Sequence, residues 1–287
     1  MRLGHGAPRR EPYTMGARTS QNGAAIVEHP CQSPLVVIPP LTPVRDHLPT
    51  RTLPFVNYAL IAANIAVFLL ERATIAGGVS PDSLLHTWGL VPRHALADPT
   101  LGAETVLTSM FMHDPTNLLH VGGNMLFLWI FGDNVEDALG HGRYLLFYLL
   151  GGLFAAAAQV LAGPLSPIPM VGASGAISAV LAAYALLYPR SSITVFNPIF
   201  LLWFFYGVFL HLPAWLVIGE FFVINLWDAL TNTAQGGVAF MAHVGGAIGG
   251  ALLFGPFMVG RVRMDQYSRW EQWARRRGGT GRTEWYS

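Results

Sequence analysis

Long runs of apolar residues alternate with short polar segments over most of the chain, and this pattern predicts membrane-spanning helices. Six stretches each hold roughly the 17 to 25 residues that a helix needs to cross a bilayer. They cover residues 55–70, 118–135, 144–161, 171–188, part of 195–229, and 238–259. We therefore expect an all-α membrane protein built as a bundle of six transmembrane helices.

The fifth stretch is the hardest to delimit, because residues 195–229 are almost all apolar. Pro213 is expected to begin the spanning helix there, since proline suits the first turn of a helix. The preceding residues 196–212 are expected to lie along the membrane interface.

Composition supports a lipid environment for most of the chain. The 287 residues are 52% hydrophobic and 11% charged, whereas soluble domains carry about 25% charged residues. A chain with so little charge cannot cover a water-facing surface. The single cysteine, Cys31, cannot form a disulfide within the chain.

Arginines gather at the two ends of the chain, and every basic residue is an arginine. Six precede the first apolar stretch and seven follow the last. An even number of spans puts both groups on one side, which the positive-inside rule identifies as the cytoplasm. Arg143 and Arg190 then fall in cytoplasmic turns, and Arg72 and Arg93 fall outside. We expect an integral protein of a bacterial inner (plasma) membrane with both termini cytoplasmic.

The two ends of the chain are expected to be tails. Residues 1–53 are rich in Pro, Arg and Ser and lack a sustained period, which predicts a disordered cytoplasmic segment. A mitochondrial transit peptide is the alternative, which the prolines and Glu11 disfavour. Residues 54–260 form the predicted domain. Residues 261–287 form a basic cytoplasmic tail, and Trp270 and Trp273 make it either an interfacial anchor or a solvated segment.

Polar groups within the predicted spans are costly and indicate function, and four such residues matter most. They are His120 and Asn124 on the second span, Ser174 on the fourth and His243 on the sixth. All three spans enter from the outer side in the expected topology. At about 1.5 Å per residue, His120, Ser174 and His243 share a layer roughly 5 to 10 Å below the outer surface.

Stripes of small residues predict which of these spans pack together. Ser174 and Ser178 lie four residues apart, and His243, Gly246 and Gly250 share one helical face. Small residues at such spacing let membrane helices approach closely. If the fourth and sixth spans pack through these stripes, Ser174 meets His243. A serine within hydrogen-bond reach of a histidine is the minimal activated nucleophile.

The local sequence around Ser174 also suits catalysis. The sequence Gly-Ala-Ser-Gly at residues 172–175 follows a proline-rich loop and begins a helix. Backbone N–H groups at a helix start have no intrahelical partner, so they can stabilise an oxyanion. His120 and Asn124 could add side-chain donors from the facing helix.

Four short motifs occur in order along these spans. They are His120-Val-Gly-Gly-Asn124, Trp129-Ile-Phe-Gly-Asp-Asn-Val-Glu136-Asp137, Gly172-Ala173-Ser174-Gly175-Ala, and Ala242-His243-Val-Gly-Gly246-Ala-Ile-Gly-Gly250. Over about residues 55–260, the chain resembles the rhomboid family of intramembrane serine proteases. The resemblance implies a six-helix rhomboid-like bundle that cleaves the transmembrane helices of substrate proteins near their outer ends.

The resemblance also implies a role for each motif residue. Ser174 is the nucleophile and His243 the general base, with no carboxylate completing a triad. His120, Asn124 and the backbone around Ala173 form the oxyanion hole. We assign helix packing to Gly172, Gly175, Ser178, Gly246 and Gly250. Some family members carry Tyr at the position of Ser178, packed on the catalytic histidine, so the smaller serine leaves the orientation of His243 undetermined.

Partners follow from the same resemblance. We expect single-pass or other transmembrane proteins as substrates, contact with membrane lipid, no nucleic acid partner and no metal, nucleotide or other cofactor. Hydrolysis needs water, so we expect a cavity from the outer face to Ser174. The fourth span should be short, ending near Pro189, and residues 72–117 should lie partly in the membrane plane. His113 is interpreted as a residue that orders this loop.

An intramembrane metalloprotease would need a motif such as His-Glu-x-x-His, which is absent. An aspartyl protease needs two facing carboxylates, and Glu220 is the one deep candidate. A transporter could relay protons through His120, His243 and Glu220, but it does not need Ser174 in its motif.

A rhomboid-like protein that binds helices without cutting them is disfavoured by the presence of both Ser174 and His243. Glu220 is interpreted as protonated or structurally paired rather than as a proton relay. Glu136 and Asp137, at the inner end of the second span, are interpreted as capping or loop contacts.

Overall fold

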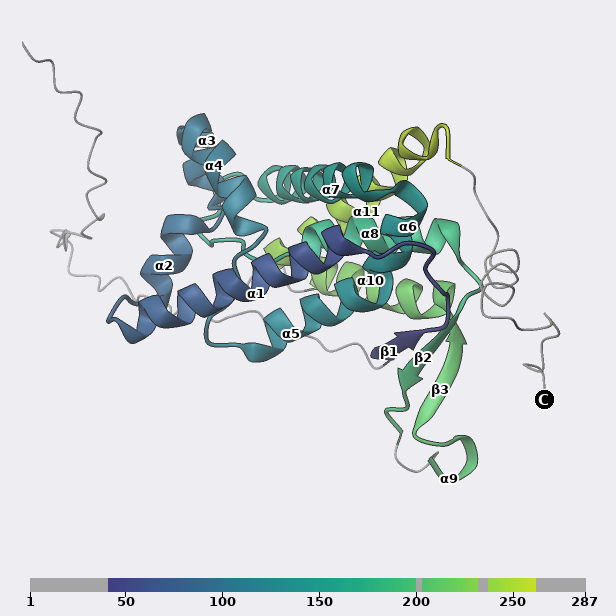
Figure 1. The fold of residues 1–287 in the computed structure, drawn as a ribbon. Helices are drawn as coiled ribbons and strands as arrows, with labels where there is room; N and C mark the ends of the chain where they lie inside the picture. The colour runs from purple at the N-terminus through teal and green to yellow at the C-terminus, as the bar shows by residue number, and fades with distance from the viewer. Residues whose placement is uncertain (1–40, 200–202, 232–236, 262–287) are drawn as a thin grey trace, which may run out of the picture. The chain divides into compact units, whose positions relative to one another are not determined.

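The computed structural model describes residues 41–199, 203–231 and 237–261, all within one compact unit of the chain. It is a helical bundle with a small sheet beside the start of its first helix (Figure 1). Residues 1–40 and 262–287, and with them the predicted anchor around Trp270 and Trp273, lie outside the described residues.

All six predicted stretches fall on helices. In chain order these are α1 (Phe55–Ala76), the continuous run of α5 (Leu118–Phe127), η1 (Leu128–Gly132) and α6 (Asp133–Leu139), then α7 (His141–Ala162), α8 (Ser174–Leu187), α10 (Ala214–Thr231) and α11 (Gly237–Met258). Among the described residues, α1, α7 and residues 240–258 are long and apolar enough to cross a membrane, while α8 and α10 are shorter apolar helices. The chain is an integral membrane protein, and its helices are consistent with six spans.

Helix α8 lies at the centre of the bundle, packed against α7 and α11. Most of its side chains are buried, and Tyr184 near its end is fully enclosed. Tyr144, Phe147 and Tyr148 of α7 and Phe131 of η1 are equally buried. Large aromatic rings therefore fill the inner part of the core, while small residues line the contact between α8 and α11.

The second span widens into a π-helical turn at η1. The amide of Asn57 on α1 donates to the carbonyl oxygen of Leu128 at 2.9 Å, and its own oxygen accepts from the hydroxyl of Tyr144 at 2.8 Å. Gly132 must lack a side chain, because a β-carbon there would collide with the Asn57 amide. An inserted polar side chain thus accounts for the irregular turn.

The segment between α1 and α5 contains three short helices that the sequence pattern did not predict. They are α2 (Pro81–Trp88), α3 (Pro92–Ala97) and α4 (Pro99–Ser109). Each begins with a proline, and the side chains of Ser80 and Asp98 accept hydrogen bonds from the first backbone N–H groups of α2 and α4. Figure 1 shows these helices at the end of the bundle away from the sheet.

The sheet was also not predicted. It has the order β1-β2-β3, with antiparallel strands β1 (Pro43–Asp46), β2 (Ser192–Phe196) and β3 (Phe209–Pro213), and the short helix α9 (Trp203–Tyr206) precedes β3. Ile193 and Val195 of β2 are fully buried, and their neighbours are not. This alternation covers only five positions within an almost wholly apolar stretch, so the sequence pattern does not reveal the strand. Residues 196–212 were therefore expected to lie along the membrane interface.

Strand β1 corrects the predicted boundary of the N-terminal tail. Residues 41–53 were expected to be disordered with the rest of residues 1–53, yet β1 pairs with β2 and belongs to the sheet. Asp46 accepts hydrogen bonds from the amide of Asn134 at 2.7 Å and the hydroxyl of Tyr184 at 2.9 Å. The partners of this segment lie far away in the chain, so no local pattern reveals it.

Candidate active site

Ser174 and His243 are hydrogen-bonded to each other, as the sequence predicted. Ser174 is the first residue of α8, and His243 lies in the second turn of α11. The Oγ atom of Ser174 lies 2.7 Å from Nε2 of His243. Both residues are partly exposed.

The close approach of α8 and α11 places the two side chains together. A β-carbon on Gly246 would collide with the carbonyl oxygen of Gly175, and one on Gly250 would lie 2.5 Å from the Cα atom of Ala179. Ser178, which is fully buried, lies 3.2 Å from the same position on Gly246. The predicted small-residue stripes therefore do face each other.

Ser178 itself bonds within its own helix. Its Oγ donates to the carbonyl oxygen of Ser174 at 2.8 Å, a common use of serine in membrane helices. The rings beside the imidazole of His243 are Phe221, at 5.9 Å between centroids, and Phe240, at 6.3 Å. Ser178 therefore takes part in packing and does not supply a ring against the histidine.

His120 presents a hydrogen-bond donor beside Ser174. Its Nδ1 accepts from the backbone N–H of Asp114 at 3.2 Å, so the ring hydrogen of a neutral His120 lies on Nε2. That Nε2 is 2.9 Å from where a β-carbon of Gly172 would lie, and Oγ of Ser174 is 3.5 Å from the same point. The geometry brings an N–H donor to the space next to the serine hydroxyl.

Asn124 lies one helical turn after His120 and is buried. Its amide donates to the carbonyl oxygen of His120 at 3.0 Å, which leaves the second amide hydrogen for another acceptor. Asn124 thus lies on the same face as His120, as expected from the spacing of four residues.

The loop before Ser174 is held by backbone contacts to the segment that contains α2 to α4. Leu90 and Met170 exchange two backbone hydrogen bonds of 3.0 and 2.8 Å, and the N–H of Gly172 donates to the carbonyl of Ser109 at 2.9 Å. Gly172 has a φ of 125°, a conformation that favours glycine. Ala173 is fully buried. The backbone hydrogen bonds and this burial together hold the chain at the start of α8.

His113 lies between α4 and α5, in the segment of residues 72–117 that it was predicted to order. Its backbone N–H donates to the Glu71 carboxylate on α1, at 3.1 and 3.3 Å to the two oxygens. Its ring is buried 5.2 Å from the ring of His120, measured between centroids. His113 therefore packs behind His120 and does not face Ser174 through a hydrogen bond.

Sequence reasoning missed Asn225 of α10. This buried amide is hydrogen-bonded through Oδ1 to Nδ1 of His243. The available signal was a polar residue inside an apolar span. Because the limits of the fifth span could not be delimited from the sequence, the depth of Asn225 in the membrane could not be inferred.

Glu220, also on α10, accepts from the backbone N–H of Leu41 at 3.2 and 3.3 Å. The carboxylate therefore fixes the segment that leads into β1. This contact agrees with the structural reading of Glu220 and not with a proton relay. Within the described residues, no group of three or more His, Cys, Asp or Glu residues is arranged to hold a metal ion.

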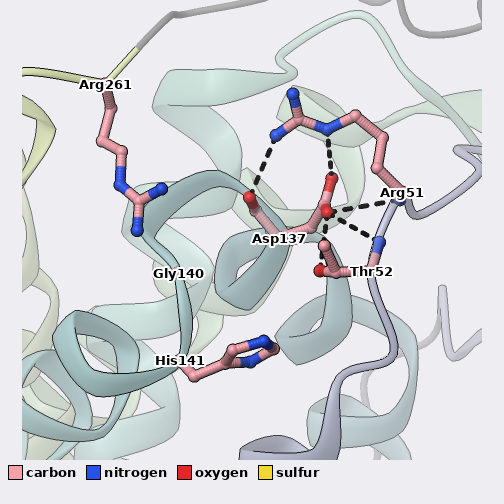
Figure 2. A pocket seen from close by; sticks show the side chains of 6 residues that line it. All are labelled: Arg51, Thr52, Asp137, Gly140, His141 and Arg261. Carbon is pink, nitrogen blue, oxygen red and sulfur yellow. Dashed lines mark hydrogen bonds and ion pairs between the residues drawn. The ribbon is translucent and has the colours of Figure 1, made fainter.

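A cavity of about 430 Å³ lies elsewhere, and Figure 2 shows its lining residues Arg51, Thr52, Asp137, Gly140, His141 and Arg261. Asp137 accepts from the backbone N–H groups of Arg51 and Thr52 at 3.2 and 3.1 Å and forms an ion pair with the Arg51 side chain at 3.0 Å. The cavity adjoins the start of α7, whereas Gly175, next to Ser174, packs against Ala155, 14 residues further along that helix and about 21 Å away along its axis. It is therefore separate from the Ser174–His243 pair.

The neighbouring Glu136 has a similar structural role. Its carboxylate accepts from the backbone N–H groups of Val56 and Asn57 at 3.1 and 2.7 Å, and it contacts His141 at 2.5 Å. A carboxylate at a helix start satisfies unpaired donors and complements the helix dipole. Glu136 and Asp137 are thus capping and loop contacts, as the sequence predicted.

Comparison with known proteins agrees with this geometry. Residues 102–259 match the family model of the Rhomboid domain. The chain is 28% identical to Rhomboid protein 1, mitochondrial, of Saccharomyces cerevisiae over 81% of its own length and 60% of that protein. It is 35% identical to Rhomboid protease GluP of Bacillus subtilis over 47% of its length and 24% of the relative. It is 27% identical to Presenilin-associated rhomboid-like protein, mitochondrial, of Bos taurus over 74% of its length and 52% of that protein. The chain thus spans between about a quarter and three fifths of these relatives.

Proposed function

Because the chain belongs to the rhomboid family, we propose that it is an intramembrane serine endopeptidase that uses Ser174 and His243. The observation that carries the proposal is the 2.7 Å contact between Oγ of Ser174 and Nε2 of His243. One relative, Rhomboid protease GluP, is named as a protease. A protein that only bound membrane helices would not need this contact.

In the first half of the proposed reaction, Oγ of Ser174 attacks the carbonyl carbon of a substrate peptide bond. Nε2 of His243 takes the serine proton and returns it to the departing amine as the C–N bond breaks. In the second half, His243 takes a proton from water, the resulting hydroxide attacks the acyl-enzyme, and the proton returns to Oγ as the ester bond breaks. The products are two peptide fragments, and the enzyme is regenerated.

The negative charge that develops on the substrate oxygen needs donors close to Ser174. The start of α8 supplies backbone N–H groups that no turn of the helix satisfies. Nε2–H of His120 lies beside Gly172 and faces the same space. The second amide hydrogen of Asn124 is the third proposed donor. Removal of one such donor slows the reaction by about 10² to 10³.

The proposed substrates are single-pass or other transmembrane proteins. A helical peptide bond is shielded by its own backbone hydrogen bonds, so the substrate must unwind locally before Ser174 reaches it. Gly and Pro near the cut make unwinding easier, because they are the weakest helix formers. Ala and Ser are proposed as small side chains at the cut itself. We propose that the cut lies near the outer end of the helix, because Ser174 starts α8 at the end of the bundle away from the sheet.

Orientation and membrane are part of the same proposal. The arginine distribution puts both termini and the sheet on the cytoplasmic side and Ser174 near the outer side. The expectation of a bacterial plasma membrane is narrower than the relatives support, since two of the three proteins named above are mitochondrial and one is from Bacillus subtilis. The proposal therefore specifies the topology and not the organelle.

The test is cleavage of a model single-span substrate by the purified full-length protein in liposomes, with a chelator present. The wild type is expected to cut, and Ser174→Ala and His243→Ala are expected to fall to background. Val223→Ala, on the exposed face of α10, serves as the control variant. A Ser174→Ala protein that cleaves at the wild-type rate would refute the mechanism.

A further inference from the structure

The imidazole of His243 is held by hydrogen bonds on both ring nitrogens. Nε2 is bonded to Oγ of Ser174 at 2.7 Å, and Nδ1 is bonded to Oδ1 of Asn225. The ring therefore bridges α8 and α10, although it belongs to α11. Which nitrogen carries the hydrogen decides whether His243 can accept the serine proton.

The orientation of the Asn225 amide settles the hydrogen position. Its Nδ2 donates to the carbonyl oxygen of Phe221, one turn earlier in α10, at 2.7 Å. A carbonyl oxygen can only accept, so the NH₂ group must lie on that side and Oδ1 must face His243. Oδ1 has no hydrogen to give, so Nδ1 of His243 is the donor. Nε2 is then left with a lone pair that accepts from the hydroxyl of Ser174.

The surroundings of His243 give Asn225 this task. Ser178 uses its hydroxyl on the carbonyl oxygen of Ser174, and Phe221 and Phe240 confine the ring without offering a polar acceptor. Asn225 is 7% exposed, so water has little access to its amide and cannot readily take its place. The amide is therefore the group that fixes the imidazole in the plane that points Nε2 at Ser174.

We propose that Asn225 is a positioning residue of the Ser174–His243 pair, which it serves by selecting the Nδ1–H tautomer of His243 and holding the ring towards Ser174. This inference rests on the proposed protease function. When Nε2 takes the serine proton, Nδ1–H still donates to Oδ1, so the same contact is kept through the reaction. Asn225 is neutral, so its loss should cost less than the roughly 10⁴-fold loss that follows replacement of a triad aspartate.

Two substitutions separate positioning from helix packing. Asn225→Leu keeps a similar volume but removes both hydrogen bonds of the amide. Asn225→Asp keeps an oxygen acceptor for Nδ1–H and loses the donor to Phe221. Val223→Ala, two residues earlier on α10 and 67% exposed, is the matched control. Should Asn225→Leu not fold, Asn225→Ala takes its place.

Each variant is measured for kcat and KM on the single-span substrate in liposomes, for the labelling rate of Ser174 by a fluorophosphonate, and for thermal unfolding. Asn225→Leu should lower kcat and the labelling rate roughly 10- to 100-fold with KM within about threefold of wild type, since the substrate contacts are unchanged. Asn225→Asp should recover most of that loss. Val223→Ala should match the wild type in all three measurements.

Either of two results would overturn the inference. One is an Asn225→Leu or Asn225→Ala protein with wild-type kcat and labelling rate. The other is an equal loss in Asn225→Asp and Asn225→Leu together with an equal fall in unfolding temperature, which would make the role structural. The labelling rate tests the positioning role separately from the proposed proteolysis. If Ser174 is labelled at a rate that depends on Asn225 but the wild type cuts no substrate, the positioning role is supported and proteolysis is contradicted.

Discussion

Gly246 of α11 lies so close to Gly175 of α8 that a β-carbon on Gly246 would collide with the carbonyl oxygen of Gly175. One turn below the Ser174–His243 contact, the two helices thus touch through their backbones. The distance between Ser174 and His243 therefore depends on a residue that takes no part in the proposed chemistry.

Gly246→Ala should separate α8 from α11 and reduce cleavage. The added methyl group must push the carbonyl of Gly175 away, and overpacking of this kind costs about 1 to 3 kcal/mol. We expect a lower unfolding temperature and at least a tenfold slower cleavage. Gly255→Ala on the same helix is the control, because a β-carbon there meets nothing within 4 Å. Equal behaviour of the two variants would contradict the close-packing explanation.

Gly172→Ala should impair the oxyanion site while the bundle stays folded. The residue has a φ of 125°, and its β-carbon would lie 2.9 Å from Nε2 of His120. We expect cleavage at least tenfold slower, because His120 must move away from Ser174. Gly207→Ala tests backbone strain alone, since Gly207 also has a positive φ, of 79°, with open space around it. Cleavage that falls equally in both variants would show that strain, not His120, is responsible.

His120→Ala should slow cleavage by about 10² to 10³, the range expected for the loss of one oxyanion donor. The effect should appear in kcat more than in KM, since the donor acts on charge that develops during the reaction. His113→Phe is the control, because the His113 ring is buried behind His120 and neither ring nitrogen has a hydrogen-bond partner among the described residues. A similar loss in both variants would point to loop packing as the cause.

Asp137→Ala should destabilise the fold and leave the Ser174–His243 pair intact. The buried carboxylate accepts from two backbone N–H groups and from the Arg51 guanidinium, so its removal should cost about 2 to 3 kcal/mol. Arg51→Ala should cost about 1 kcal/mol or less, because the arginine side chain is 32% exposed and the backbone contacts remain. Unfolding in detergent measures the difference. The labelling rate of Ser174 at low temperature should be unchanged in both, and a tenfold loss in either would link this end of the bundle to the site.

Accessibility of single cysteines should establish the orientation. In a Cys31→Ser background, Leu165→Cys, in the loop between α7 and α8, should react with a membrane-impermeant reagent added outside. Arg190→Cys, just after α8, should react only after the membrane is opened. The reverse pattern would invert the topology and place the proposed cut near the inner end of the substrate helix.

Much of this protein follows from local properties of the sequence. Apolar runs of helical length locate the spans, because each helix satisfies its own backbone hydrogen bonds and needs only an apolar surface in lipid. The cost of polar groups in such spans singles out Ser174 and His243, and the glycines beside them predict which helices meet. The contact between Ser174 and His243 could therefore be inferred from the sequence.

Tertiary structure decided what depends on partners distant in the chain. Strand β1 exists because it pairs with β2, about 150 residues later, and nothing within residues 43–46 reveals that partner. The tautomers of His120 and His243 depend on the N–H of Asp114 and the amide of Asn225, and the direction of that amide depends on a carbonyl of its own helix. Residue types alone permit either tautomer, so only the three-dimensional arrangement determines which nitrogen of His243 faces Ser174.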